Sequence, residues 1–245
     1  MRLGVLGLGF MGATHIRALD GIEGVTLAAI SSSDPKKLAG DLSSVGGNLG
    51  EGFATLDFSQ VDKHPRWETI LEDPTIDAVD ICLPTHLHAP ATEAALRAGK
   101  HVLVEKPMAL DFETAIQLVA LAKQQGKILM AAQVLRFFTM YRQMADLVRS
   151  GTLGQVRAAA FRRRCSAPPW AAWMQDKSVS GGGVFDLLLI GFTLLIEGFD
   201  VHVPKGYIYF AMAFAFLVDV IQMKVAGKKS HPVKLNEHFT EDAKK

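Results

Sequence analysis

Short apolar runs alternate with stretches of helical spacing through the first 132 residues. Each run is too short for a helix and is bounded by turn residues, which is typical of strands buried on both faces of a parallel sheet. The runs are Leu3–Leu6, Val25–Ile30, Ala78–Leu83, His101–Val104 and Ile128–Ala132. Strands that alternate with helices in this way predict a doubly wound, Rossmann-type α/β sheet over residues 1–132.

A G-x-G-x-x-G turn joins the first strand to its helix. Gly7 permits the tight turn, Gly9 lets the backbone approach a pyrophosphate, and Gly12 lets helix and strand pack closely. The N–H groups and the positive dipole end of the helix then face the anion. We therefore expect dinucleotide binding here, with Phe10 and Met11 in the same turn, against the alternative of a purely structural glycine-rich turn.

The end of the second strand predicts which dinucleotide is bound. An acidic side chain selects NAD about 20 residues after the glycines, but Ser32 and Ser33 stand there instead. With Lys36 and Lys37 nearby, this segment favours the 2′-phosphate of NADP, although NAD stays open. The structural alternative is that Asp34-Pro35 caps a helix whose exposed start carries the lysines.

Composition narrows the classes of partner. The net charge of +1 gives no basic field for nucleic acid. Cys82 and Cys165 offer neither a disulfide framework nor a zinc spacing, which fits a reducing cytoplasm and predicts no metal site. The mean hydropathy of +0.19 is high for a soluble enzyme, and the excess comes from the last quarter of the chain.

Two loops follow predicted strands at the edge where open α/β sheets bind ligands. The first is Pro84-Thr85-His86-Leu87-His88, and the second is Glu105-Lys106-Pro107. In a site with little water, an ammonium group stabilises the alkoxide charge that develops as hydride leaves a carbinol carbon. Lys106 can supply that charge, although a lysine before a proline is also common in exposed turns.

Together these elements resemble the glucose–fructose oxidoreductase/inositol dehydrogenase (Gfo/Idh/MocA) family, in its order and spacing, over residues 1 to about 186. The glycine turn, the Asp77–Pro84 strand, Pro84-Thr85-x-x-His88, Gly99-Lys100-His101-Val102 and Glu105-Lys106-Pro107 carry the resemblance. It implies NAD(P)-linked oxidation or reduction of a sugar, cyclitol or related polyol.

The resemblance also implies roles for single residues. Lys106 would lie beside the nicotinamide and the reacting hydroxyl, and Glu105 would help to place it. Pro84, Thr85 and His88 would face the cofactor, although His88 is nearly as well explained as a helix-start histidine. Two further positions, Gln133 and Arg136, would face the substrate, with Arg136 equally well explained as a helix-start cation.

The second domain, which begins at residue 133, departs from the family pattern at its end. Asp186 matches the family's second motif and would belong to its catalytic centre, but Ile190 stands where the general acid/base histidine is expected. Loss of a positioned acid/base typically lowers the rate 10²- to 10⁴-fold. Residues 187–245 also lack the alternation that sheet strands require, so the substrate domain over 133–186 is expected to be truncated.

Residues 187–245 have a different character. The segment from about 187 to 235 resembles the C-terminal end of TerC-type integral membrane proteins, in particular at Glu197-Gly198-Phe199 and Pro204-Lys205-Gly206-Tyr207. It contains two apolar stretches, 187–203 and 206–223. They predict membrane association through 187–223. The structural alternative is a hairpin of core helices packed on the first domain. A fusion of two unrelated gene fragments would explain both resemblances.

Three functions therefore stay open from the sequence. The first is an NADP-linked oxidoreductase that is impaired or incomplete. The second is a dinucleotide-binding protein without turnover, since Ile190 removes the proton acceptor. The third is a TerC-like membrane protein fragment joined to a Rossmann domain.

Overall fold

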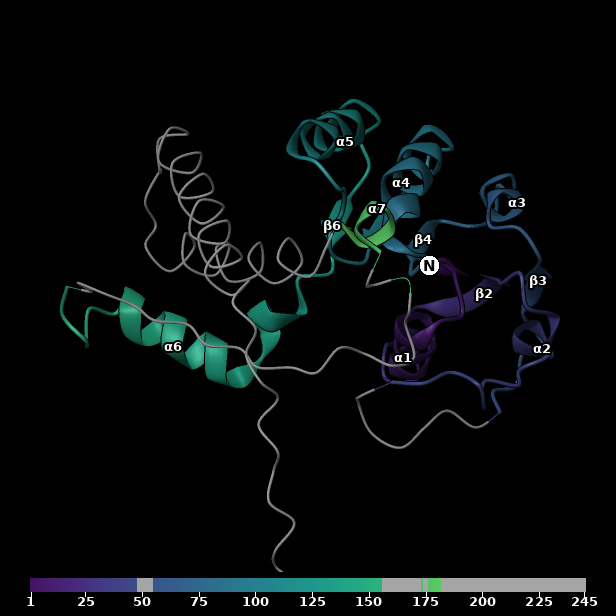
Figure 1. Ribbon diagram of the computed structural model, residues 1–245, viewed down its shortest axis with the longest axis horizontal. Coiled ribbons are helices and arrows are strands. Elements are labelled where there is room, and N and C mark those ends of the chain that lie inside the picture. The colour runs from purple at the N-terminus through teal and green to yellow at the C-terminus, as the bar shows by residue number, and fades with distance from the viewer. Residues whose placement is uncertain (48–54, 156–172, 174–175, 182–245) are drawn as a thin grey trace, which may run out of the picture. The chain divides into compact units, whose positions relative to one another are not determined.

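The computed structural model describes residues 1–47, 55–155, 173 and 176–181, all within the first of the chain's two units, Met1–Phe199. Strands and helices alternate along most of this part (Figure 1). The strands are β1 (Arg2–Leu6), β2 (Thr26–Ser31), β3 (Asp62–His64), β4 (Ala78–Ile81), β5 (His101–Val104) and β6 (Leu129–Ala131). The α-helices are α1 (Phe10–Leu19), α2 (Pro35–Leu38), α3 (Glu68–Leu71), α4 (His88–Arg97), α5 (Phe112–Gln124), α6 (Thr139–Arg149) and α7 (Lys177–Ser180), and two short 3₁₀ helices are η1 (Thr85–Leu87) and η2 (Val134–Phe137).

The six strands form one parallel sheet in the order β3-β2-β1-β4-β5-β6. This order confirms the Rossmann-type fold, in which the sheet reverses its direction of growth between β1 and β4 and opens a crevice at their carboxyl ends. Leu6 pairs with Ile81, and Ile81 pairs with Val104. The last residues of β1, β4 and β5 are therefore level, and the loops that follow them open at one edge of the sheet.

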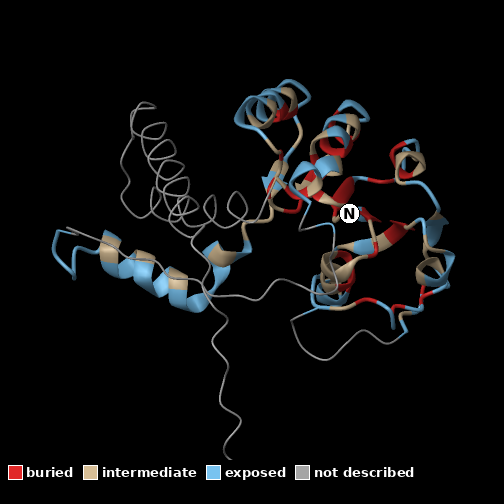
Figure 2. Cartoon of the chain, in the orientation of Figure 1, coloured by how far each residue is buried: buried red, intermediate tan, exposed pale blue. Residues whose placement is uncertain are grey.

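Helices cover both faces of the sheet. Figure 1 shows α1 and α2 on one side and α3, α4 and α5 on the other. Alternate residues of β1 pack into the two layers: Leu3 and Val5 join the cluster under α1 with Ile16, whereas Leu6 joins the cluster under α4 with Leu96. The buried residues therefore line the two faces of the sheet (Figure 2).

Local signals in the sequence account for the helix ends. Asp34 accepts a hydrogen bond from the backbone N–H of Lys36 at 2.9 Å, and Asp111 accepts one from that of Thr114 at 2.8 Å. The first contact is the cap that Asp34-Pro35 predicts, and the second caps α5 in the same way. Gly99 and Gly126 adopt φ of +74° and +62° just after α4 and α5, the left-handed conformation that ends a helix with least strain in glycine.

A buried lysine connects the segment before β4 to the turn before β5. Lys100 is only 4% exposed, and its ammonium donates to the backbone carbonyls of Asp73 at 2.5 Å and Ile76 at 2.9 Å. These carbonyls belong to the segment between α3 and β4, so one side chain ties that segment to the turn before β5. A buried charge held by backbone acceptors is expensive to leave unpaired.

The five predicted apolar runs agree with β1, β2, β4, β5 and β6 to within two residues at each end. The segment 43–66 contributes β3 at the sheet edge. Asp186, Ile190 and the apolar stretches 187–203 and 206–223 lie outside the described residues. Within the described ranges, no helix combines the length and apolar character needed to cross a bilayer.

Candidate functional site

The glycine turn leaves no room for side chains at two of its three glycines. Gly7 has φ of +101°, and a Cβ there would lie 2.7 Å from the Cys82 carbonyl oxygen. A Cβ on buried Gly12 would lie 2.0 Å from the Gly7 carbonyl oxygen, whereas one on Gly9 would meet nothing within 4 Å. The turn is therefore closed on the protein side and open at Gly9, where the sequence predicts the approach of a pyrophosphate. Phe10 and Met11 begin α1, and both are half-buried.

The end of β2 presents hydroxyl groups and a lysine. Ser32 is half-buried, and its Oγ accepts a hydrogen bond from the backbone N–H of Asp34 at 3.1 Å. Ser33 and Lys36 are exposed. The carboxylate of Asp34 accepts the backbone N–H of Lys36 at the start of α2, which confirms the predicted cap. The side chain of Lys36 is nevertheless exposed, so this cap does not exclude a contact with a ligand. The role of these residues toward a ribose phosphate stays a prediction.

One histidine joins the loops after β4 and β5. His88 is 2% exposed; its Nδ1 lies 2.7 Å from the Pro107 carbonyl oxygen, and its Nε2 lies 2.7 Å from the Leu83 carbonyl oxygen. Both ring nitrogens are used by the backbone, which fits the helix-start alternative for His88 rather than contact with a ribose. The same imidazole thereby positions Pro84, which follows Leu83, and the buried Thr85.

Lys106 follows β5 at the same edge of the sheet. It is half-buried, and its backbone N–H donates to Oε2 of its neighbour Glu105 at 3.0 Å. Glu105 is 6% exposed, and the peptide bond between Lys106 and Pro107 is cis. The carboxylate of Glu105 therefore holds the backbone of Lys106, and the placing role that the family resemblance implies for Glu105 stays a prediction.

A polar cluster that the sequence does not predict lies between α1 and the ends of β4 and β5. His15, on α1, has Nδ1 2.8 Å from Asp80 Oδ2 and Nε2 3.4 Å from Glu105 Oε1. Cys82 Sγ lies 3.5 Å from His15 Nδ1 and 3.5 Å from Asp80 Oδ1. The alternation of β4 explains the placement, because Val79 and Ile81 pack toward α4 and the residues between and after them face α1.

The cluster favours a charged imidazole. Burial alone lowers the pKa of His15, but hydrogen bonds with its three neighbours outweigh burial and raise the pKa from 6.5 to about 12. Burial raises the pKa of the Cys82 thiol from 9.0 to about 12, against the opposing hydrogen bond with His15. His15 is thus an imidazolium between two buried carboxyl side chains, with a protonated thiol beside it.

The same donor atoms raise the question of a metal. One atom from each of His15, Asp80 and Cys82 lies within 4.8 Å of the others, and no other such group occurs among the residues that the structure describes. The spacing of 2.8 Å between the imidazole and the carboxylate is that of a charge-assisted hydrogen bond. Hydrogen bonding therefore accounts for the arrangement without an ion.

The predicted substrate positions lie after β6. Gln133 is half-buried at the start of η2, and Arg136 is exposed within it. Asp186 lies outside the described residues, so the structure does not bring it together with Lys106. The role of all three toward a substrate stays a prediction.

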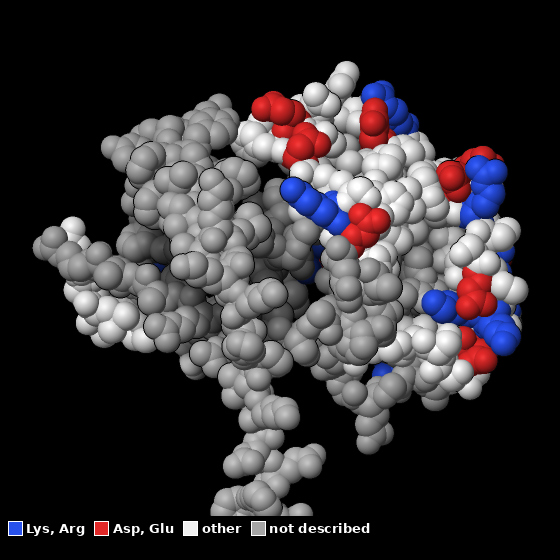
Figure 3. All heavy atoms as spheres, viewed as in Figure 1, with Lys and Arg blue, Asp and Glu red and all other residues white. Residues whose placement is uncertain are grey.

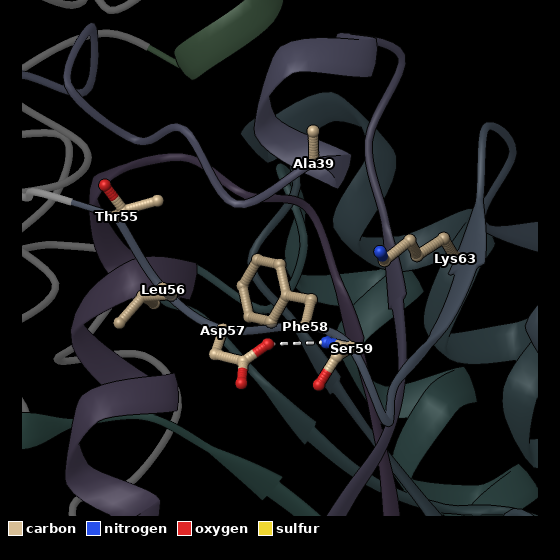
Figure 4. Close-up of a pocket in the computed structure, with 7 residues that line it drawn as sticks. All are labelled: Ala39, Thr55, Leu56, Asp57, Phe58, Ser59 and Lys63. Atoms are coloured by element: carbon tan, nitrogen blue, oxygen red, sulfur yellow. Dashed lines mark hydrogen bonds between the residues drawn. The ribbon is translucent and has the colours of Figure 1, made fainter.

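The described part of the surface has mixed charge and a hollow near β3. On the viewed face, lysine and arginine side chains lie beside acidic ones (Figure 3). The chain has exposed ion pairs between Arg97 and Glu93 at 2.8 Å and between Arg66 and Glu68 at 3.6 Å. A hollow of about 480 Å³ lies near β3 (Figure 4). It is lined by Ala39, Thr55, Leu56, Asp57, Phe58, Ser59 and Lys63, none of which is a predicted site residue. The candidate site is the strand-end crevice rather than this hollow.

Comparison with known families now decides the lineage. Residues 1–133, more than half of the chain, match the model of the Gfo/Idh/MocA oxidoreductase family with an NAD-binding Rossmann fold. The chain belongs to the Gfo/Idh/MocA family. A myo-inositol 2-dehydrogenase of Thermotoga maritima is 29% identical over 194 residues, which are 79% of this chain and 53% of that protein. The chain spans about half the length of the curated relatives it matches.

Solved Gfo/Idh/MocA structures share the fold. A 3-ketoreductase from Actinomadura kijaniata in complex with NADP has a TM-score of 0.61 and 28% identity, over 76% of this chain and 54% of that one. A scyllo-inositol dehydrogenase from Lactobacillus casei with bound NAD(H) has a TM-score of 0.52 and 26% identity, over 63% and 42% of the two chains. Both forms of the cofactor therefore occur among the structural relatives of this family member.

Proposed function

We propose that this Gfo/Idh/MocA protein binds NADP and takes part in hydride transfer at a carbinol or keto carbon of a sugar, cyclitol or related polyol. The observation that carries the proposal is a strand pairing: Leu6 pairs with Ile81 and Ile81 with Val104, so β1, β4 and β5 end side by side. It opens the glycine turn, the Pro84-Thr85 loop and Lys106 at one edge of the sheet, where doubly wound folds bind dinucleotides.

The glycine turn fits a pyrophosphate. The closed packing at Gly7 and Gly12 leaves the backbone at Gly9 uncovered, so a charged group can reach the first N–H groups of α1. Phe10 and Met11 would flank that group. A 2′-phosphate would meet the hydroxyls of Ser32 and Ser33 and the ammonium of Lys36, and no acidic side chain stands at the position of Ser32 to repel it.

At the nicotinamide end of the crevice, Lys106 is the residue that would act on the substrate. When bound, the nicotinamide supplies or accepts hydride at the reacting carbon. Lys106 would stabilise the negative charge on the substrate oxygen, and its half-buried position limits competition from water. Gln133 and Arg136 would hold the substrate's hydroxyl groups, as the family resemblance implies.

We infer that turnover is impaired in this chain. The family's acid/base histidine is replaced by Ile190, so Asp186 has no titratable partner four residues later. Lys106 can stabilise charge, but it is not accompanied by the positioned proton acceptor that usually contributes 10²- to 10⁴-fold to the rate. Cofactor binding depends on other residues and would persist.

The test begins with binding and then asks for turnover. The full chain is titrated with NADPH and with NADH while nicotinamide fluorescence is recorded, and oxidation of inositols and sugars is followed through the absorbance of the reduced cofactor. We expect saturable binding with preference for NADPH, weak turnover, and a gain in turnover for Ile190→His but not for the matched Ile190→Gln. Absence of a saturable NADPH signal would refute the proposal.

A dinucleotide-binding protein without turnover is the second candidate, and Ile190 favours it. It predicts the same titration curves but no turnover in Ile190→His. Membrane association of 187–223 stays a prediction of the apolar sequence alone. Partition of the purified chain between a detergent phase and buffer tests it, and complete recovery from buffer would argue against insertion.

A further inference from the structure

The Glu105 carboxylate has two separate partners. Its Oε2 accepts the backbone N–H of Lys106 at 3.0 Å, and its Oε1 faces His15 Nε2 at 3.4 Å. One side chain therefore links the helix that carries the glycine turn to the backbone of the residue proposed to act on substrate. The link is sheltered, because Glu105 is 6% exposed and the His15 side chain is 21% exposed.

The geometry requires the imidazole to donate at both ends. Each ring nitrogen faces a carboxylate oxygen, and an ionised carboxylate only accepts hydrogen bonds. The imidazolium of His15 therefore donates to Asp80, which anchors the ring on β4, and forms an ion pair with Glu105 at 3.4 Å at the end of β5. Its charge also balances one of the two buried carboxylates, whereas Cys82 contributes a neutral thiol beside Asp80.

Because His15 lies on α1, its contact with Glu105 connects the glycine turn to the end of β5. His15 lies three residues after Gly12, on the helix whose first turn closes the glycine cradle. A shift of α1 would therefore move the Glu105 carboxylate as well as the cradle. Because a displacement of about 1 Å can lower a rate by about 10²-fold, a fixed distance between the two ends of the crevice matters for hydride transfer.

We propose that His15 is a positioning residue: through Glu105 it fixes the backbone of Lys106 relative to the glycine turn, and so sets the nicotinamide end of the site. The inference rests on the proposed function, because it assumes that NADPH spans the crevice from the turn to Lys106. It assigns His15 no contact with cofactor or substrate.

Two substitutions of His15 separate its two contacts. The amide nitrogen of Gln can occupy the place of Nε2 and donate to Glu105, whereas that of Asn can occupy the place of Nδ1 and donate to Asp80. A merely structural role predicts that Asn is the milder change, since the Asp80 contact at 2.8 Å is the shorter one. A positioning role through Glu105 predicts that His15→Gln weakens binding of the nicotinamide end less than His15→Asn does.

The readout compares NADPH with 2′-phospho-ADP-ribose, which lacks the nicotinamide. Binding of each to the full chain is measured by calorimetry, and the ratio of the two affinities reports the nicotinamide end alone. We expect His15→Asn to lower this ratio about tenfold, the effect of one charge-assisted hydrogen bond. His15→Gln should lower it no more than about twofold, and Cys82→Ser, which leaves both contacts in place, should leave it unchanged.

Glu105→Gln provides the second route, should His15→Asn fail to fold. In Gln an NH2 group replaces one of the two carboxylate oxygens, so a donor would face either His15 or the backbone N–H of Lys106, and the variant should lower the same ratio. The double variant with His15→Asn should show little further loss, because both changes break one link.

Each result decides a different statement. If the wild type binds both ligands and every variant keeps the wild-type ratio, the positioning role of His15 is wrong while the proposed function stands. Stoichiometric metal in the wild type that is lost in His15→Asn would also overturn it, since an imidazolium cannot be a ligand. If the wild type binds neither ligand, both proposals fall.

Discussion

Adding one methyl group at two glycines of the same turn should separate folding from binding. At Gly12 the new Cβ would lie 2.0 Å from the carbonyl oxygen of Gly7 and 3.5 Å from the Cβ of Cys82. The carbonyl belongs to the backbone of the tight turn, so neither partner is a flexible side chain that could yield. At Gly9 the same methyl would meet nothing within 4 Å, and φ of −84° suits any residue.

The structure sets the expected magnitudes. Overpacking a buried site typically costs about 1 to 3 kcal/mol, and Gly12→Ala should reach the upper end because backbone must move. Gly9 is the N-cap of α1, where alanine is poorer than glycine, so Gly9→Ala should cost less than about 1 kcal/mol. Its methyl would nevertheless stand where the pyrophosphate approaches, and NADPH affinity should fall at least about tenfold.

Urea unfolding followed by far-UV circular dichroism, without cofactor, measures the first effect. NADPH titration of the folded variants measures the second, and stabilisation by saturating NADPH provides an independent estimate of affinity. If Gly9→Ala binds NADPH like the wild type, the nucleotide does not lie on this turn and the proposed function loses its basis. If Gly12→Ala is as stable as Gly9→Ala, our account of how the turn is closed is wrong.

Three further predictions concern stability and cofactor choice. Lys100→Met leaves two buried carbonyls without their donor and should lower the free energy of unfolding by about 2 to 3 kcal/mol in urea, whereas the exposed Lys123→Met should change it by less than about 0.5 kcal/mol. The raised pKa of His15 means that the folded state holds a proton the unfolded state loses, so its stabilisation is complete below pH 6.5 and disappears as the pH rises toward about 12. From about pH 7 to 8.5, below the ordinary thiol pKa of 9.0, wild-type stability should fall relative to His15→Gln by up to about 1.4 kcal/mol per pH unit, and parallel curves would contradict the charged imidazole. Ser32→Asp places a carboxylate where a 2′-phosphate is expected and should reduce the ratio of NADPH to NADH affinity at least about tenfold, and an unchanged ratio would remove the basis for the NADP preference.

Local patterns in the sequence predicted the sheet well, because they depend on neighbours along the chain. The predicted run His101–Val104 coincides with β5, and Asp34-Pro35 predicts the observed start of α2. The alternation of strands and helices predicts a doubly wound parallel sheet, but this class includes more than one strand order, so the observed order comes from the folded chain.

The buried polar cluster could not be assembled in the same way. A lone charge at Asp80 within an apolar strand and a histidine three residues after Gly12 were its only signals in the sequence. Neither signal names its partner, because strand register and helix packing decide which side chains meet. The separation of 65 residues between His15 and Asp80 is bridged only in the folded chain.

The imidazole of His88 has a consequence for the entropy of binding. Because its two nitrogens fasten the loops after β4 and β5 to each other, the rim of the crevice is rigid before any nucleotide arrives. The conformational freedom of those loops is lost when the chain folds and is not subtracted again from affinity. Loops held together in this way favour nucleotide binding independently of the residues that turnover requires.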